Sequence, residues 1–203
     1  FNMISVIKYD GGNVSSVINV LKRCNIDFIL TDSFDEIKKS KKIILPGVSN
    51  FAYCMKSLKK KELDKKLFEE VIINKKSFLG ICSGMQVLGS YSSEGNAEGL
   101  NFIPGEIIKF PVEKDIISPH VGWNKINFKK NNICEGLKTN IRVYFSHSYY
   151  FKVKSEDHSF ITTNYNIKFC SGVSKNNIYG IQFHPEKSLV SGMRILKNFS
   201  DHC

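Results

Sequence analysis

The chain has 203 residues, of which 42% are hydrophobic and 24% charged, and its formal net charge is +10. This balance is typical of a globular domain with its own core, and it excludes a disordered or fibrous chain. No apolar run approaches the roughly 18 residues that a membrane-spanning helix needs. No nucleic-acid-binding signature accompanies the many lysines, so we expect neither nucleic acid nor a membrane as a partner.

The first half of the chain alternates predicted strands and helices. Short apolar runs predict strands at 4–9, 28–30, 43–45 and 78–81. Helices are expected at 14–21, where apolar residues recur at i, i+3, i+4 and i+7, near 35–39, over 51–71 and from 85 onward. Strands that alternate with helices form a mainly parallel sheet covered on both faces, so this half predicts an α/β fold.

The second half is richer in strands. Runs separated by turn residues predict strands at 107–110, 125–128, 142–145, 149–153, 160–163 and 178–183, followed by a last helix near 192–199. We expect some of these strands to form an antiparallel extension beside the parallel sheet. With no internal repeat and no clear linker, the sequence predicts one domain over residues 3–201.

Six cysteines are distributed along the chain, at Cys24, Cys54, Cys82, Cys134, Cys170 and Cys203. None stands in a C-x-x-C pair, and no cluster of cysteine and histidine has the spacing of a zinc site. We therefore expect reduced thiols, a cytoplasmic location and no metal.

The run Gly80–Gly84, with the sequence Gly-Ile-Cys-Ser-Gly, fits a nucleophile held between a strand and a helix. Glycine on both sides of Cys82 clears space in a tight turn where larger neighbours would clash. The N-terminus of the following helix would point at the sulfur and favour the thiolate. The alternative is a buried structural cysteine, so a catalytic reading requires a partner histidine.

His184 is the best candidate among the five histidines because it follows the apolar run 178–183. It would lie at the carboxyl end of a strand, the edge where catalytic groups of open α/β sheets collect, and Cys82 ends its own strand there. Pro185 favours extended backbone at His184, so Glu186 can lie on the same side and orient the ring. The alternative is a surface His-Pro turn with a solvated glutamate.

Together these motifs resemble the class I, or triad, glutamine amidotransferases. The run Gly80–Gln86 is similar to that family's nucleophile turn, and His184–Glu186 to its His/Glu pair. Within the class the chain resembles the HisH glutaminase subunits of imidazole glycerol phosphate synthase, on the runs 9–13, 45–48, 119–124, 145–150 and 182–188. The resemblance covers almost the whole chain and implies a three-layer, flavodoxin-like α/β fold.

The resemblance also implies roles for individual residues. The triad would be Cys82, His184 and Glu186; the oxyanion site Gly47, Val48 and Ser83; the glutamine-binding residues Gln86, His147, Ser148 and Tyr149; and the partner-facing residues Asn13, Trp123 and Lys187. The implied reaction hydrolyses L-glutamine to glutamate and ammonia, without metal or cofactor. Ammonia would pass to a (β/α)8 cyclase subunit in a heterodimer that forms imidazole glycerol phosphate and AICAR in histidine biosynthesis.

Four positions depart from the family pattern. Ser49 stands where glycine is usual and Ser83 where leucine is usual. In the first loop, Lys8 stands where aspartate is usual and Asp10 where the first glycine is usual. Two alternatives stay open from the sequence. One is a related glutaminase that supplies ammonia to a sugar-modifying synthase, and the other is a catalytically silent, partner-binding module.

Overall fold

The computed structural model describes residues 3–12, 14–112 and 117–203. Asn13, which the resemblance assigns to the partner interface, lies outside the described residues. The strands are β1 (Ile4–Ile7), β2 (Phe28–Thr31), β3 (Lys42–Gly47), β4 (Ser77–Cys82), β5 (Tyr91–Ser92), β6 (Ala97–Glu98), β7 (Gly105–Lys109), β8 (His120–Phe128), β9 (Arg142–His147), β10 (Tyr149–Val153), β11 (Ser159–Tyr165), β12 (Ile167–Lys175) and β13 (Ile178–Ile181). The α-helices are α1 (Val14–Arg23), α2 (Phe34–Lys39), α3 (Phe51–Lys60), α4 (Leu63–Leu67), α5 (Ser83–Gln86) and α6 (Leu189–His202), with shorter helical turns η1 (Phe68–Ile73), η2 (Asn132–Cys134), η3 (Glu156–His158) and η4 (Pro185–Lys187).

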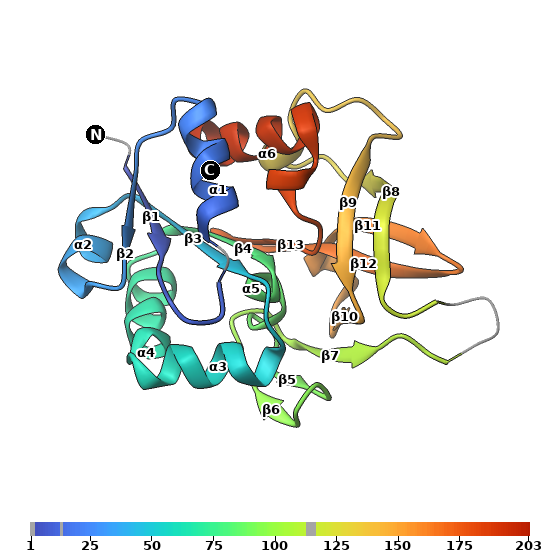
Figure 1. Cartoon of the computed structure of the whole chain (residues 1–203), viewed down its shortest axis with the longest axis horizontal. Helices are drawn as coiled ribbons and strands as arrows, with labels where there is room; N and C mark the ends of the chain where they lie inside the picture. The colour runs from blue at the N-terminus through green and yellow to red at the C-terminus, as the bar shows by residue number, and fades with distance from the viewer. Residues whose placement is uncertain (1–2, 13, 113–116) are drawn as a thin grey trace.

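Strands β1 to β4 of the first half of the chain form a parallel sheet with one strand from the second half (Figure 1). Its strands lie in the order β2-β1-β3-β4-β13, and every neighbouring pair is parallel. The last of these strands comes from the far end of the sequence, and Ile181 of β13 lies opposite Ile81 of β4. The two strands that end at the predicted nucleophile and base are therefore neighbours, as the shared sheet edge predicted.

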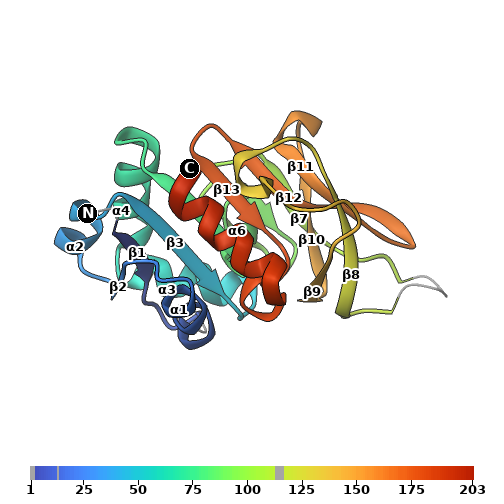
Figure 2. The same cartoon turned by 90° about the horizontal axis from the view of Figure 1, so that it is seen from above.

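The parallel strands are buried on both faces, and their apolar residues divide between two cores. In β3, Ile44 packs with α1 and α6, whereas Ile43 and Leu45 pack with α3 and α4. This division follows from the two-residue period of a strand, which turns successive side chains to opposite faces. Figures 1 and 2 show α1 and α6 on one side of the sheet and α3 and α4 on the other, which confirms the three-layer α/β fold.

An antiparallel extension continues the sheet beyond β13. β12 pairs with β13, β10 with β12 and β7 with β10, all antiparallel, while β11, β8 and β9 branch from β12. Three strands, β5, β6 and β12, were not predicted. The helix expected over 51–71 is divided into α3, α4 and the π-helical η1, with Glu62 in the left-handed region at φ 54°. The helix expected from 85 is the four-residue α5.

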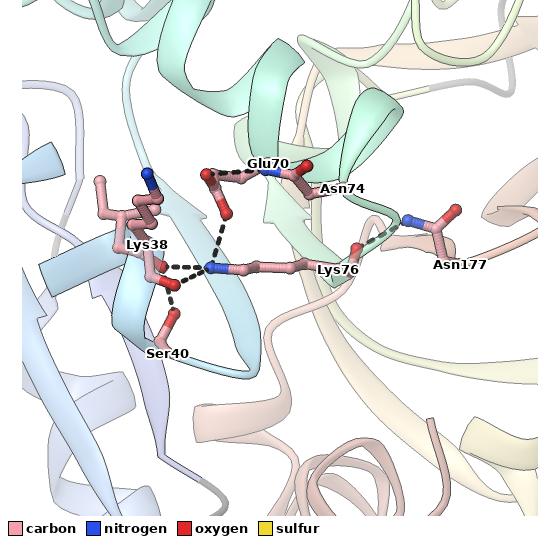
Figure 3. A network of polar contacts seen from close by, with 7 residues as sticks. Lys38, Ser40, Glu70, Asn74, Lys76 and Asn177 are labelled. Carbon is pink, nitrogen blue, oxygen red and sulfur yellow. Dashed lines mark hydrogen bonds and ion pairs between the residues drawn. The ribbon is translucent and has the colours of Figure 1, made fainter. Parts of the chain in front are cut away.

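A buried ion pair lies at the start of β4 (Figure 3). The Nζ of Lys76 is 2.6 Å from the Oε2 of Glu70, whose side chain is 1% exposed. The same ammonium donates to the carbonyl oxygens of Ile37 and Lys38 at the end of α2, at 2.8 and 2.5 Å. Asn177 donates to the Lys76 carbonyl at 2.6 Å. One cation thus ties α2, η1 and β4 together.

Candidate active site

Cys82 is held in strained backbone at the turn between β4 and α5. Its φ is 54° and its ψ is −114°, a conformation that non-glycine residues rarely adopt. The flanking glycines are required by space. A Cβ at Gly84 would lie 2.0 Å from the carbonyl oxygen of Leu45, and one at Gly80 would lie 2.3 Å from the carbonyl oxygen of Gly84. The sulfur therefore protrudes from a turn that accepts no side chain at either glycine.

His184 and Glu186 form a buried pair just after β13. The Nδ1 of His184 lies 2.8 Å from the Oε1 of Glu186, and each side chain is 4% exposed. The backbone of this turn is fixed by its neighbours, because the His184 amide donates to the Tyr144 carbonyl at 2.9 Å and the Ser188 hydroxyl donates to the His184 carbonyl at 2.6 Å. The imidazole consequently has little freedom to turn.

The remaining nitrogen of His184, Nε2, is directed to the sulfur of Cys82. Burial by itself would lower the pKa of His184, but hydrogen bonds to Cys82 and Glu186 and the charges of both groups raise it to about 10. The rise shows that the surroundings of His184 favour its protonated form. The three residues predicted as a triad thus lie together at one edge of the sheet.

A cavity of about 260 Å³ opens in front of the Cys82 sulfur. It is lined by Val48, Ser49, Asn50, Cys82, Ser83, Gln86, Glu94, Pro119, Ser146, His147, Ser148 and Tyr149. All four residues predicted to bind glutamine line this space. Its size and mostly polar lining suit a small, polar ligand whose reacting carbon would lie beside the sulfur.

The predicted oxyanion residues are together but are not all arranged as donors. Gly47 pairs with Cys82 across β3 and β4, and the Ser83 amide, as the first of α5, has no acceptor within the helix. The Val48 amide, however, donates to the carbonyl of Gly11 at 3.1 Å. In this conformation the Val48 N–H is occupied within the protein and is not directed into the cavity.

His147 contributes to the cavity wall, while its ring nitrogens are used inside the protein. Its Nδ1 lies 2.7 Å from the Tyr149 carbonyl oxygen, and its Nε2 lies 3.1 Å from the Nδ1 of His120. Burial, with smaller effects from His120 and His184, lowers the pKa of His147 to about 3. Burial likewise lowers the pKa of His120 to about 4. Both rings are therefore neutral at pH 7.

The predicted partner-facing residues Trp123 and Lys187 both lie next to the ring of Tyr144. The Trp123 and Tyr144 rings are 6.1 Å apart, and the Lys187 Nζ is 5.4 Å from the Tyr144 ring centroid. Trp123 is 40% exposed. Tyr144 was not predicted, yet its backbone holds His184 while its ring holds this exposed group of side chains.

Two further residues near the sulfur were missed by the sequence analysis. The Nε2 of Gln182 lies 3.7 Å from the Cys82 sulfur, and the sulfur is 4.0 Å from the Ser146 carbonyl oxygen. The signal for Gln182 was available, because it stands two residues before His184 and so shares its side of the strand. In the described ranges, no group of three or more His, Cys, Asp or Glu side chains could hold a metal ion.

The geometry agrees with the comparison to known proteins. The family model for class-I glutamine amidotransferases matches residues 6–203. The chain belongs to the class-I glutamine amidotransferase family. Two HisH relatives of this amidotransferase are "Imidazole glycerol phosphate synthase subunit HisH 2" from Methanococcus maripaludis, 42% identical over 97% of this chain and 98% of the relative, and the protein of the same name from Pseudomonas aeruginosa, 41% identical over the same shares. A HisH subunit from Bdellovibrio bacteriovorus is 39% identical over 98% and 100%.

Solved structures show the same fold for this amidotransferase. A crystal structure of a glutamine amidotransferase covers 97% of this chain and 96% of its own, with a TM-score of 0.76 and 16% identity. The crystal structure of a putative GMP synthase component from Thermoplasma acidophilum covers 98% and 92%, with a TM-score of 0.72 and 21% identity. At these identities the likeness concerns the fold. In the described part of the chain, no helix has the length and apolar character needed to cross a membrane.

Proposed function

We propose that this protein is the glutaminase subunit of imidazole glycerol phosphate synthase, which hydrolyses L-glutamine to glutamate and ammonia for a cyclase subunit in histidine biosynthesis. The observation that carries the proposal is the contact of Cys82, His184 and Glu186 at one edge of the sheet, where Cys82 lines a polar cavity. The HisH relatives, about as long as this chain and 39–42% identical to it, support the choice of complex.

The contact between Cys82 and His184 defines how the reaction would begin. His184 accepts the proton of the Cys82 thiol, and the thiolate attacks the side-chain carbonyl carbon of glutamine. The imidazolium then gives its Nε2 proton to the departing nitrogen, and ammonia leaves a thioester on Cys82. Neutral His184 next takes a proton from water, which attacks the thioester and releases glutamate, while Glu186 keeps the ring oriented throughout.

Two backbone amides would stabilise the negative oxygen of the tetrahedral intermediate. The Ser83 amide starts α5 beside the sulfur, and the Val48 amide lies at the end of β3. Loss of one such donor typically lowers the rate by about 100- to 1000-fold. Because Val48 donates to Gly11 in this structure, it must exchange that bond for the substrate oxygen during catalysis.

The cavity wall suggests how glutamine would be held. Both amide hydrogens of Gln86 are used, on the Tyr149 carbonyl and on the Oε1 of Gln182, each at 3.0 Å. Only the Oε1 of Gln86 is left to accept a hydrogen bond from the substrate. The backbone of Ser148 and Tyr149, which also lines the cavity, would bind the amino-acid end of glutamine.

The chemistry of the product ammonia implies a partner protein. Ammonia released into neutral water becomes ammonium and loses its nucleophilicity, so a docked synthase must receive it. We infer a cytoplasmic heterodimer with a (β/α)8 cyclase, in which residues 3–201 act as one domain and Trp123 and Lys187 contact the partner. The exposed Trp123–Tyr144–Lys187 group supports this choice, since aromatic side chains are enriched at interfaces.

The nucleophile is tested by replacing Cys82. In the complex with its cyclase, Cys82→Ala is expected to lower glutamate production at least 1000-fold, because no other group near His184 can form the thioester. Glutamate release and complex formation are measured together, and complex formation should be unchanged. The matched control is Cys134→Ala at a buried thiol whose pKa burial raises to about 12, which should keep full activity. Substantial hydrolysis by Cys82→Ala would refute the mechanism.

A further inference from the structure

A chain of buried amides leads from the cavity wall to the sulfur of Cys82. The Gln86 side chain donates to the Tyr149 carbonyl and to the Gln182 Oε1, and the Gln182 Nε2 faces the sulfur at 3.7 Å. Gln182 is 0% exposed and Gln86 is 4% exposed. None of the steps in the reaction described above uses Gln182, although it is one of the few polar groups in contact with the nucleophile.

The orientation of the Gln182 amide follows from the hydrogen-bond partners of Gln86. A backbone carbonyl only accepts hydrogen bonds, so the Gln86 atom next to the Tyr149 oxygen must be its nitrogen. That nitrogen also faces Gln182, so the Gln182 atom there must be the oxygen. The other end of the Gln182 amide is then the nitrogen, and it presents an N–H to the sulfur of Cys82 rather than a lone pair.

The Tyr149 carbonyl, which fixes the orientation of the Gln86 and Gln182 amides, is itself held in place by hydrogen bonds. The ring of His147 lies against the same Tyr149 oxygen at 2.7 Å, and His147 in turn contacts His120 at 3.1 Å. Since the Asn124 Nδ2, at 3.3 Å, can only donate to the His120 Nε2, His120 donates through Nδ1 and His147 through its own Nδ1. Both lone pairs of the Tyr149 oxygen are thus occupied, and the Gln86 amide cannot reverse without losing a bond.

We propose that Gln182 is a further catalytic residue of the glutaminase site, which donates a hydrogen bond to the sulfur of Cys82 and stabilises its thiolate form. The inference rests on the proposed function and extends it to a residue outside the Cys82–His184–Glu186 triad. A hydrogen bond to an ionised acceptor is stronger than a neutral one, so Gln182 favours the thiolate over the thiol. The other titratable groups near the sulfur are His184, Glu186 behind it and Tyr9.

The test measures the ionisation of Cys82 rather than turnover. The rate at which iodoacetamide alkylates Cys82 is followed from pH 4 to 10 in the full chain, by mass spectrometry of the peptide that contains it. Gln182→Met keeps the approximate length and removes the donor. The midpoint of the pH profile should rise by about one pH unit, a tenfold change in the ratio of thiolate to thiol. Gln86→Met, which frees the Gln182 amide to turn, should shift the midpoint less and in the same direction.

The control removes a buried amide elsewhere. Asn198 is 3% exposed and donates to the Ile133 and Glu135 carbonyls, so Asn198→Leu should lower the melting temperature and leave the midpoint unchanged. A midpoint that stays within 0.2 pH unit in Gln182→Met, roughly the error of such a profile, would overturn the proposal even if activity fell. If Gln182→Met does not fold, an unchanged midpoint in Gln86→Met overturns it. Alkylation needs neither glutamine nor a partner, so its result is separate from that of Cys82→Ala.

Discussion

Three buried histidines near the active site have opposite preferences for the proton. His184 faces Cys82 and Glu186, and hydrogen bonds to these two groups together with their charges raise its pKa to about 10. His147 and His120 face each other, a carbonyl and aromatic rings, and burial lowers their pKa values to about 3 and 4. Similar burial thus produces a charged group in one place and two neutral groups in another, and the difference is set by the partner atoms.

The neutral histidines make the fold sensitive to acid. Unfolded histidine titrates near 6.5, well above the folded pKa of about 4 for His120, so the unfolded chain binds the additional protons between these values. The free energy of unfolding therefore falls as pH drops from 6.5 toward 4, by on the order of 1 kcal/mol per pH unit for each such group. Above pH 6.5, the contribution of these neutral histidines to the free energy of unfolding has its full value and no longer changes with pH.

Substitution of His120 by phenylalanine should weaken that dependence. The ring would still stack between Phe145 and Tyr165, where His120 lies 4.7 and 4.0 Å from their centroids. The lost bond to His147 should cost about 1 kcal/mol at pH 7, but the slope of stability against pH below 6.5 should be shallower. Urea unfolding at pH 7, 5.5 and 4.5 measures both effects. Parallel pH profiles for the two proteins would contradict this account, and the solvent-exposed His202→Gln is the control.

The sequence predicted the proposed triad and the pairing of Glu186 with His184, but not the other hydrogen bonds of the site. Cys82, His184 and Glu186 could be found because glycine spacing, proline and strand period are local signals. The bond between Val48 and Gly11 joins loops that are distant in sequence, and no local pattern encodes which way a peptide unit faces. Gln182 carried a local signal, but its donor role depends on Tyr149 and Gln86, which only the folded chain brings near.

At the scale of the elements, the Glu70–Lys76 ion pair at the start of β4 can be tested for its contribution to the free energy of unfolding. Lys76→Met would leave Glu70, 1% exposed, as a buried charge without its cation, and would free the carbonyls at the end of α2 (Figure 3). Loss of one partner of a buried pair typically costs about 3–5 kcal/mol. Urea unfolding of the single variant should show a loss in this range, and the double variant Glu70→Leu with Lys76→Met should recover much of it.

An exposed pair provides the control for this experiment. Lys65 and Glu62 are 3.0 Å apart with side chains 76% and 67% exposed, so Lys65→Met should leave the free energy of unfolding nearly unchanged. If Lys76→Met were equally mild, the buried pair would not hold α2, η1 and β4 together.

The longest strand that the sequence missed, β12, lacks the residue pattern by which a strand is recognised. β12 is a nine-residue strand in which Lys168, Ser171, Gly172 and Ser174 interrupt the apolar residues, so no clean alternation marks it. It is stabilised by pairing with β11, β10 and β13 rather than by its own pattern. The strands of the parallel sheet were easier to predict because burial on both faces produces continuous apolar runs.

At the scale of the whole molecule, the exposed Trp123–Tyr144–Lys187 group, where β8 pairs with β9, predicts where the partner binds. Trp123→Ala should weaken binding of the cyclase at least tenfold, since exposed tryptophans that become buried are frequent binding hot spots. Titration calorimetry of the two proteins measures the change. Tyr91, in β5 and 39% exposed against 40% for Trp123, is a matched control, and Tyr91→Ala should leave the affinity unchanged. Equal effects of both substitutions would place the partner elsewhere.

The pairing of β4 with β13 aligns Ile81 with Ile181. This alignment directs the side chains of Gln182 and His184 toward the sulfur of Cys82, while the side chain of Phe183 enters the core. A slip by one residue would exchange those directions and present a phenyl ring to the sulfur. Such a molecule would keep nearly all its secondary structure and be inert. Glutamate formation after refolding would therefore count the molecules whose central strands are correctly aligned, a quantity that circular dichroism does not resolve.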